Sequence, residues 1–141
     1  MTEEHIYLAD ETATEQLGAR LAAEFASGGV VTLEGELGTG KTTLVRGWLR
    51  ALGHKGAVKS PTYTIVEPYE LQGLNVYHFD LYRLGDAEEL ELMGVRDYFD
   101  QGALCLVEWP QRGTGILPPA DLHVQLTVAL PGRQAVLIRR P

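Results

Sequence analysis

The sequence predicts an α/β protein of three layers, with helices on both faces of a mixed, mainly parallel sheet that also carries antiparallel hairpins. A short β-branched, apolar run at 30–33 precedes a glycine-rich loop at 35–42, and apolar residues at helical spacing follow at 42–52. A continuous apolar run at 103–108 is typical of a buried parallel strand. This order of elements indicates a P-loop NTPase-like fold, and 141 residues suit a single domain over 1–141.

The remaining segments predict the edges of this sheet. An apolar stretch at 6–8 is expected to form an edge strand, and a capping box at 12–15 is expected to open the first helix. Segments 65–71 and 75–81 predict one β-hairpin, and 122–139 predicts a second hairpin that closes the sheet.

The glycine-rich loop carries the strongest functional signal. Gly35-Glu36-Leu37-Gly38-Thr39-Gly40-Lys41-Thr42 matches the P-loop pattern G-x-x-x-x-G-K-[ST] at every fixed position. Its glycines let the backbone approach an anion closely, and the following helix adds the positive end of its dipole. Lys41 would reach the β- and γ-phosphates of a nucleotide, and the Thr42 hydroxyl would bind Mg²⁺. The sequence therefore predicts a triphosphate site.

Composition argues against several other functions. The net charge is −7, and the chain has no Lys/Arg cluster longer than Arg139-Arg140, so we do not expect it to grip nucleic acid by itself. Cys105 is the only cysteine, which excludes an internal disulfide and favours the reducing cytoplasm. No apolar run reaches membrane-spanning length and the N-terminus lacks a signal pattern, so no membrane role is expected.

Polar residues between the two buried strands are candidates for sensing the γ-phosphate and for catalysis. Ser60, Pro61 and Thr62 precede a strand, which suits either a switch-like loop or an ordinary proline turn. Asp80 lies near the end of the first hairpin, where its carboxylate could meet Mg²⁺ or its water, or could simply be solvated. His78, on the same side of that strand, is interpreted as a structural histidine with satisfied hydrogen bonds.

Glu108 ends the apolar run at 103–108, as the acidic residue of a Walker B strand does. Parallel strands deliver ligand-binding groups at their carboxyl ends. Glu108 is therefore interpreted as a metal-site residue. For its neighbour Trp109, core packing is favoured over a lid above the site.

Absent motifs narrow the class of P-loop protein. Asn75 is the only asparagine and Val76 follows it, so the Asn-Lys-x-Asp motif of GTPases is missing, as is an Asp-x-x-Gly switch motif after the P-loop. These absences favour adenine over guanine. A small-molecule kinase and a nucleotide-dependent regulatory binding module remain as alternatives to an ATPase.

Four sequence blocks, in this order and spacing, resemble one known family. They are Gly35-Glu36-Leu37-Gly38-Thr39-Gly40-Lys41-Thr42-Thr43, Val58-Lys59-Ser60-Pro61-Thr62-Tyr63, Val76-Tyr77-His78-Phe79-Asp80-Leu81-Tyr82-Arg83 and Val107-Glu108-Trp109-Pro110. From residue 6 to about residue 138 the chain resembles the bacterial TsaE (YjeE) family, the ATPase of tRNA threonylcarbamoyladenosine biosynthesis.

The resemblance implies ATP and Mg²⁺ as ligands and weak intrinsic hydrolysis. It also implies a complex with the TsaD and TsaB proteins, which attach a threonylcarbamoyl group to the adenosine beside the tRNA anticodon. TsaE itself does not make that bond, and its ATP cycle is thought to reset the TsaD–TsaB machine. Contact with tRNA is expected only indirectly, through the complex.

The resemblance also assigns roles to individual residues. ATP binding falls to Glu11, Gly38, Thr39, Gly40, Lys41, Thr42, Thr43 and Arg133, of which Arg133 and the Asp10–Glu11 region would contact the adenosine. Mg²⁺ binding falls to Thr42 and Glu108, and catalysis to Lys41, Asp80 and Glu108. Whether Asp80 is a base or a more distant support stays open. Ser60, Pro61 and Thr62 would form the switch-like loop, Trp109 would flank the site, and Arg83 is a candidate for transition-state charge in cis.

Overall fold

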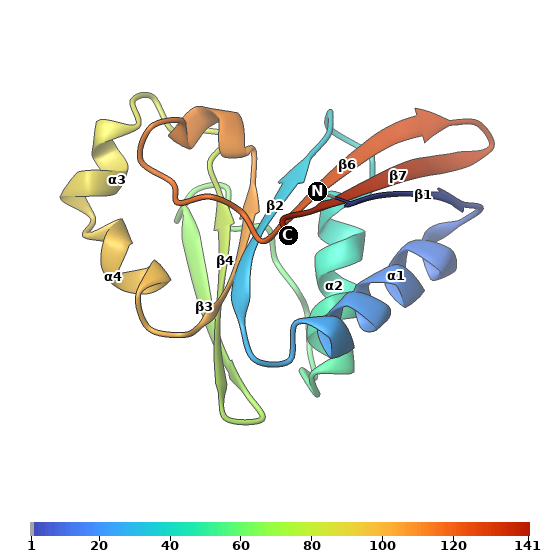
Figure 1. The fold of residues 1–141 in the computed structure, drawn as a ribbon, viewed down its shortest axis with the longest axis horizontal. Coiled ribbons are helices and arrows are strands. Elements are labelled where there is room, and N and C mark those ends of the chain that lie inside the picture. Colours follow the sequence, from blue (N-terminus) through green and yellow to red (C-terminus); the bar gives the residue numbers. More distant parts are fainter. Residues whose placement is uncertain (1) are drawn as a thin grey trace.

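The computed structural model describes residues 2–141 as one seven-stranded sheet with helices on both faces (Figure 1). The elements follow the chain in the order β1 (Thr2–Leu8), α1 (Glu11–Glu24), β2 (Gly29–Glu34), α2 (Lys41–Ala51), β3 (Val66–Leu71), β4 (Leu74–Asp80), α3 (Glu88–Leu92), α4 (Val95–Phe99), β5 (Leu104–Glu108), the 3₁₀ turn η1 (Pro110–Gly113), β6 (Leu122–Ala129) and β7 (Gly132–Arg139).

The sheet is mixed and mainly parallel, as the sequence predicts. Its strand order is β1-β7-β6-β2-β5-β4-β3. β2 pairs in parallel with both β5 and β6, and β4 pairs in parallel with β5, so four adjacent strands form a parallel centre. The pairs β1–β7, β6–β7 and β3–β4 are antiparallel. The carboxyl ends of β2, β4 and β5 therefore meet at one edge of the sheet.

Two hydrophobic cores lie on opposite faces of this sheet and give the predicted three layers. The larger core joins α1 and α2 to β2 and β6 through residues such as Leu21, Trp48 and Leu33, each with no exposed surface. The smaller core packs α3 and α4 against β4 and β5, with Phe79 and Val107 fully buried. Figure 1 shows α1 and α2 on one side of the sheet and α3 and α4 on the other, beside β3 and β4.

The predicted capping box at 12–15 is wrong, because α1 begins earlier in the chain. The helix already begins at Glu11, and Asp10 is its N-cap, with its Oδ1 accepting a hydrogen bond from the Ala13 N–H at 2.8 Å. Aspartate caps a helix as well as serine or threonine does, and Asp10 lies two residues closer to the end of β1. Thr12 consequently lies inside the first turn of the helix.

Helices α1 and α2 approach each other so closely that their backbones touch. A Cβ atom added at Gly18 would collide with the Leu44 carbonyl oxygen and lie 2.7 Å from the Trp48 nitrogen. One added at Gly47 would collide with the Glu15 carbonyl oxygen and lie 2.5 Å from the Glu15 Cα. Only glycine fits at these two helical positions. The close contact holds α2 against α1 and so positions the end of the P-loop, where α2 begins.

Candidate functional site

A cavity of about 560 Å³ lies where β2, β4 and β5 end and α2 begins. It gathers residues from six separate stretches of the chain. Its lining consists of Leu8, Ala9, Asp10, Glu11, Thr14, Leu37, Gly38, Gly40, Lys41, Thr42, Thr43, Ser60, Thr62, Asp80, Tyr82, Glu108, Trp109, Pro131, Gly132 and Arg133. The topology thus brings most of the predicted site residues to one place.

The P-loop backbone adopts conformations that favour glycine. Gly38 and Gly40 have φ angles of 82° and 101°, in the left-handed region. Gly35 is required for a different reason, since an added Cβ would lie 2.7 Å from the carbonyl oxygen of Leu126 on β6. The loop is therefore held tightly between α2 and the sheet, and its N–H groups have no side chains in front of them at these positions.

Lys41 is a buried cation at the start of α2, only 5% exposed. Its Nζ donates hydrogen bonds to the carbonyl oxygens of Gly35 and, at 3.1 Å, Glu36, and it lies 4.5 Å from the centre of the Trp109 ring. Burial lowers the pKa of Lys41, and the nearby carboxylates, Glu108 first, oppose that shift. A phosphate group in the cavity would supply the anion that this lysine lacks.

Asp80 is the centre of the hydrogen bonds that hold the loop after α2. Its Oδ2 accepts from the Ser60 hydroxyl at 2.7 Å and the Thr62 hydroxyl at 3.0 Å, and its Oδ1 accepts from the Tyr82 N–H at 3.0 Å. Asp80 is 4% exposed and pairs in register with Glu108 on the neighbouring strand. The alternative of a solvated strand-end carboxylate is therefore wrong.

Glu108 is also buried, at 3% exposure, and still lines the cavity. Its Oε2 lies 2.6 Å from the Nε2 atom of His78, which is completely buried on β4. The His78 Nδ1 atom has no hydrogen-bond partner among the described residues. The interpretation of His78 as a satisfied structural histidine is confirmed only in part: the ring is buried in the fold, but Nδ1 has no partner among the described residues, and Nε2 contacts a residue of the cavity.

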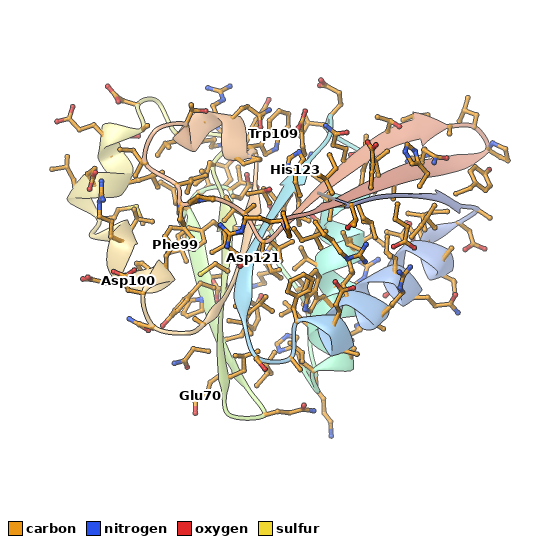
Figure 2. The ribbon with its side chains drawn as sticks, viewed as in Figure 1. Glu70, Phe99, Asp100, Trp109, Asp121 and His123 are labelled. Carbon is orange, nitrogen blue, oxygen red and sulfur yellow. The ribbon has the colours of Figure 1, made fainter. Side chains whose placement is uncertain are left out.

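Trp109 packs against the smaller hydrophobic core, as expected from the sequence, and it also lines the cavity. Its φ angle of 57° is uncommon for a residue other than glycine, and it turns the chain between β5 and η1. Figure 2 shows Trp109 at the edge of the sheet where β2 and β5 end. The ring lies against Lys41 and against Tyr82, whose ring centre is 4.9 Å away.

Part of the cavity lining comes from the N-terminal and C-terminal parts of the chain. Arg133, in the β6–β7 hairpin, donates from Nη2 to the Gly38 carbonyl oxygen at 3.1 Å and so ties the hairpin to the P-loop. Asp10, the N-cap of α1, and Glu11, the first residue of that helix, also line the cavity. A Cβ added at Gly132 would collide with the Leu8 carbonyl oxygen, so β1 and the hairpin are in direct contact there.

Three candidates lie outside the cavity lining. The Thr39 hydroxyl donates to the Glu36 carbonyl oxygen at 2.8 Å and thereby shapes the loop. Pro61 is buried, and its carbonyl oxygen accepts from the Ile65 N–H at 2.7 Å in the turn below the cavity. Arg83 is exposed and lies 4.5 Å from the centre of the Tyr63 ring, so it does not reach the cavity in this conformation.

Sequence reasoning missed several lining residues. Leu8 and Thr14 belong to segments assigned to an edge strand and a helix, Ala9 follows that strand, and no local pattern marks the three as ligand-facing. Tyr82 lies two residues beyond Asp80 within one of the blocks used for the resemblance, and its aromatic side chain was a signal that could have been used.

Oxygen atoms that suit Mg²⁺ are present in the cavity. Mg²⁺ is usually bound by one or two carboxylates, hydroxyls, waters and the phosphates of its substrate, not by an all-protein cage. In residues 2–141 no group of three or more His, Cys, Asp or Glu side chains gathers as such a cage. The Thr42 hydroxyl and the Glu108 carboxylate are oxygen donors at the cavity wall, and the donor chemistry therefore fits Mg²⁺ bound together with a phosphate.

A strand, a glycine-rich loop and a helix at the carboxyl edge of a mainly parallel sheet define the P-loop NTPase-like class. The model of the family "Threonylcarbamoyl adenosine biosynthesis protein TsaE" matches residues 8–135. The chain belongs to the TsaE family.

Individual relatives agree with this assignment. The TsaE protein of Haemophilus influenzae is 60% identical over 97 residues, covering 69% of this chain and 61% of that protein. TsaE of Bacillus subtilis is 44% identical over 107 residues, which cover 75% of this chain and 66% of that protein. The chain thus spans slightly under two thirds of these two relatives. TsaE of Nostoc is 37% identical over 135 residues, covering 92% of this chain and 82% of that protein.

A solved structure shares the fold. The crystal structure of YdiB from Bacillus subtilis superimposes with a TM-score of 0.82 at 31% identity, covering 98% of this chain and 86% of that one.

None of the helices described for residues 2–141 combines the length and the apolar character needed to cross a membrane.

Proposed function

We propose that this chain is a Mg²⁺-dependent ATP-binding and ATP-hydrolysing component that supports TsaD and TsaB in forming threonylcarbamoyladenosine beside the tRNA anticodon. One observation carries the nucleotide part of this proposal. Lys41, Thr42, Asp80 and Glu108, from three separate elements, converge on one cavity of about 560 Å³ next to the P-loop backbone. Such a cavity is large enough for a nucleotide-sized ligand.

The roles of the residues follow from their chemistry. P-loop N–H groups and Lys41 would bind the β- and γ-phosphates, while Thr42 and Glu108 would hold Mg²⁺. Mg²⁺, when bound, neutralises charge that develops on the phosphate oxygens. Asp80 already accepts two hydroxyl hydrogen bonds from the loop at Ser60 and Thr62, and in this role it couples that loop to the γ-phosphate end of the cavity.

The partner part of the proposal is supported by the small number of cationic side chains in the cavity lining. Apart from Lys41, Arg133 is the only cationic residue of the cavity lining, and its guanidinium is engaged with the backbone of Gly38 and Gly132. Since phosphoryl transfer is slow without further positive charge at the transition state, we expect weak hydrolysis by the isolated chain. TsaD–TsaB would accelerate it by completing or rearranging the site.

The decisive experiment measures ATP hydrolysis with MgCl₂ by the purified chain, alone and with TsaD–TsaB. We expect slow turnover alone, a clear increase with the partners, and little activity with GTP. Turnover that ignores the partners would contradict the partner part of the proposal. Failure to bind MgATP at millimolar concentration would contradict the nucleotide part.

Glu108→Gln sharpens this test because it removes a carboxylate charge and keeps the shape of the side chain. We expect turnover to fall about 10²-fold or more, since a metal ion contributes several kcal/mol to transition-state stabilisation. Nucleotide affinity measured without Mg²⁺ should stay within about twofold of the wild type, as for a substitution that touches no phosphate contact. Equal loss of binding and turnover would instead indicate a purely structural role for Glu108.

A further inference from the structure

His78 is a buried polar residue directly behind the candidate site. Its side chain has no exposed surface, and it lies on β4 two residues before Asp80. In the parallel pairing of β4 with β5, His78 is opposite Leu106 and Asp80 is opposite Glu108. Because bulk solvent does not reach this ring, contacts inside the fold decide which hydrogen bonds it makes.

The ring makes one such bond. The His78 Nε2 atom lies 2.6 Å from Oε2 of Glu108, and its Nδ1 atom has no partner among the described residues. When Glu108 is a carboxylate it can only accept a hydrogen bond, and the tautomer that fits this contact has its hydrogen on Nε2. Within residues 2–141, the side chain of His78 therefore makes its one hydrogen bond to the carboxylate of Glu108.

This bond restrains a side chain that would otherwise rotate. The terminal torsion of glutamate has a broad energy profile, so a carboxylate without partners samples many orientations. Among the described residues, His78 is the only side chain that donates a hydrogen bond to the Glu108 carboxylate, and it uses Oε2 alone. Glu108 lines the cavity, and its Oε1 atom accepts no hydrogen bond from a side chain among the described residues.

We propose that His78 is a positioning residue, which holds the Glu108 carboxylate in the orientation needed to bind Mg²⁺. This inference rests on the proposed function, since it requires Glu108 to be a Mg²⁺ ligand. Hydrogen-bond partners of metal-binding side chains typically contribute 10- to 100-fold to metal affinity or activity, and an effect of about that size is expected here.

The test compares three substitutions. His78→Leu removes the donor and fills a similar volume. His78→Gln places an amide N–H near the position of Nε2, whereas His78→Asn carries the same amide on a shorter side chain that does not reach Glu108. For each protein, calorimetry measures the affinity for a non-hydrolysable ATP analogue over a series of MgCl₂ concentrations and without Mg²⁺, and a thermal melt of the unliganded protein measures stability.

His78→Leu and His78→Asn should raise the Mg²⁺ concentration for half-maximal gain in nucleotide affinity by about 10- to 100-fold, without changing the affinity in the absence of Mg²⁺. His78→Gln should restore a dependence close to that of the wild type. If His78→Leu does not fold, the difference between His78→Gln and His78→Asn decides the question.

Two results would overturn the inference. A lowered melting temperature with an unchanged Mg²⁺ dependence in His78→Leu and His78→Asn would show that His78 only stabilises the fold. A wild-type protein whose nucleotide affinity ignores Mg²⁺ would overturn the proposed metal site and, with it, the role of His78. The two failures are distinguishable because the second is already visible in the wild-type protein, without any substitution.

Discussion

The cavity edge and the α1–α2 interface are both buried, but they are buried in opposite ways. At the cavity edge, Lys41, Asp80 and Glu108 are each at most 5% exposed, and the lysine is hydrogen-bonded only to backbone carbonyl oxygens. At the α1–α2 interface, Gly18 and Gly47 let two helix backbones touch beside the larger hydrophobic core, and the ion pairs of Glu15 with Arg46 and Arg50 are partly exposed. The cavity edge buries charged side chains, which is unfavourable for folding. The helix interface has glycine where any side chain would prevent close packing.

This difference in burial indicates that the charged side chains at the cavity serve ligand binding, whereas the glycines at the helix interface serve packing of the fold. Burial of an ammonium without a matched anion is unfavourable, and the lowered pKa of Lys41 reports that cost. Close helix packing instead gains dispersion energy at each contact. Substitutions at the cavity should therefore change binding and leave folding nearly intact, whereas those at the interface should do the reverse.

The largest effect is expected for Lys41→Ala. Loss of a charged partner of the phosphates should weaken ATP binding by about 10²-fold or more, because hydrogen bonds to charged groups contribute about 1.5–3 kcal/mol and further Coulomb attraction is lost. The melting temperature of the unliganded protein should stay close to that of the wild type, since burial of this lysine is unfavourable. Calorimetric titration with MgATP and a thermal melt measure the two quantities.

Lys55→Ala is the matched control, because it removes one positive charge from an exposed loop residue outside the cavity. Its ATP affinity should equal that of the wild type. Normal hydrolysis by Lys41→Ala would show that the P-loop assignment is wrong.

The next effect in size is expected for Gly47→Ala, at the helix interface. Replacing glycine by alanine within a helix usually stabilises a protein, by about 0.5–1 kcal/mol. Here the new methyl group would collide with the Glu15 backbone, so we expect the free energy of unfolding to fall by about 1–3 kcal/mol. Urea denaturation measures this change. Gln16→Ala, on the exposed side of α1, should change stability by less than about 0.5 kcal/mol. A more stable Gly47→Ala protein would refute the close backbone contact.

The smallest effect is expected at the outer side of α1, where Arg139 joins β7 to Glu24 at 2.7 Å and 2.9 Å and to Glu4 at 2.9 Å. The hydrogen bond from Arg139 lowers the pKa of Glu24 below 4.5. A carboxylate with a lowered folded-state pKa stabilises the protein above its unfolded pKa, and this stabilisation is lost as the pH falls through the folded-state pKa. Glu24→Gln should therefore cost about 0.2–1 kcal/mol at pH 7, because partly exposed ion pairs contribute that much.

The pH dependence checks the cause of this effect. The stability difference between wild type and Glu24→Gln, from urea denaturation, should stay constant between pH 7 and about pH 5 and vanish at more acidic pH, as the carboxylate of the wild type is protonated. A difference that persists below the folded-state pKa would show that packing, not charge, is responsible.

The parts of the fold that follow from local sequence were predictable. Apolar runs and helical spacing located β2, α2 and β5, and two alternating segments located both hairpins. The first helix cap was misplaced, because Asp10 and Thr12 have similar capping propensity and only the path of the chain after β1 selects between them. The backbone contact at Gly18 and Gly47 was not predicted, since a glycine within a helical pattern does not reveal what lies opposite it.

The candidate site divides in the same way. The P-loop residues, Asp80 and Glu108 could be named from spacing and chemistry, because the P-loop is contiguous and strand ends are recognisable. The burial of Asp80, the hydrogen bonds from Ser60 and Thr62, and the contact between His78 and Glu108 depend on the pairing of β4 with β5. That pairing joins segments about thirty residues apart, with α3 and α4 between them, so no tight turn sets the register as it does in a hairpin.

The sequence by itself therefore determined the class of the fold, the phosphate-binding loop and the identity of the acidic residues at the strand ends, because each depends on neighbouring residues and short-range geometry. Only the tertiary structure decided which of these groups meet in one cavity, that Trp109 and Tyr82 form its wall, and that a buried histidine holds one of its carboxylates. The physical reason is that burial and hydrogen-bond partners come from strand register and helix packing, which bring together residues that lie far apart along the chain.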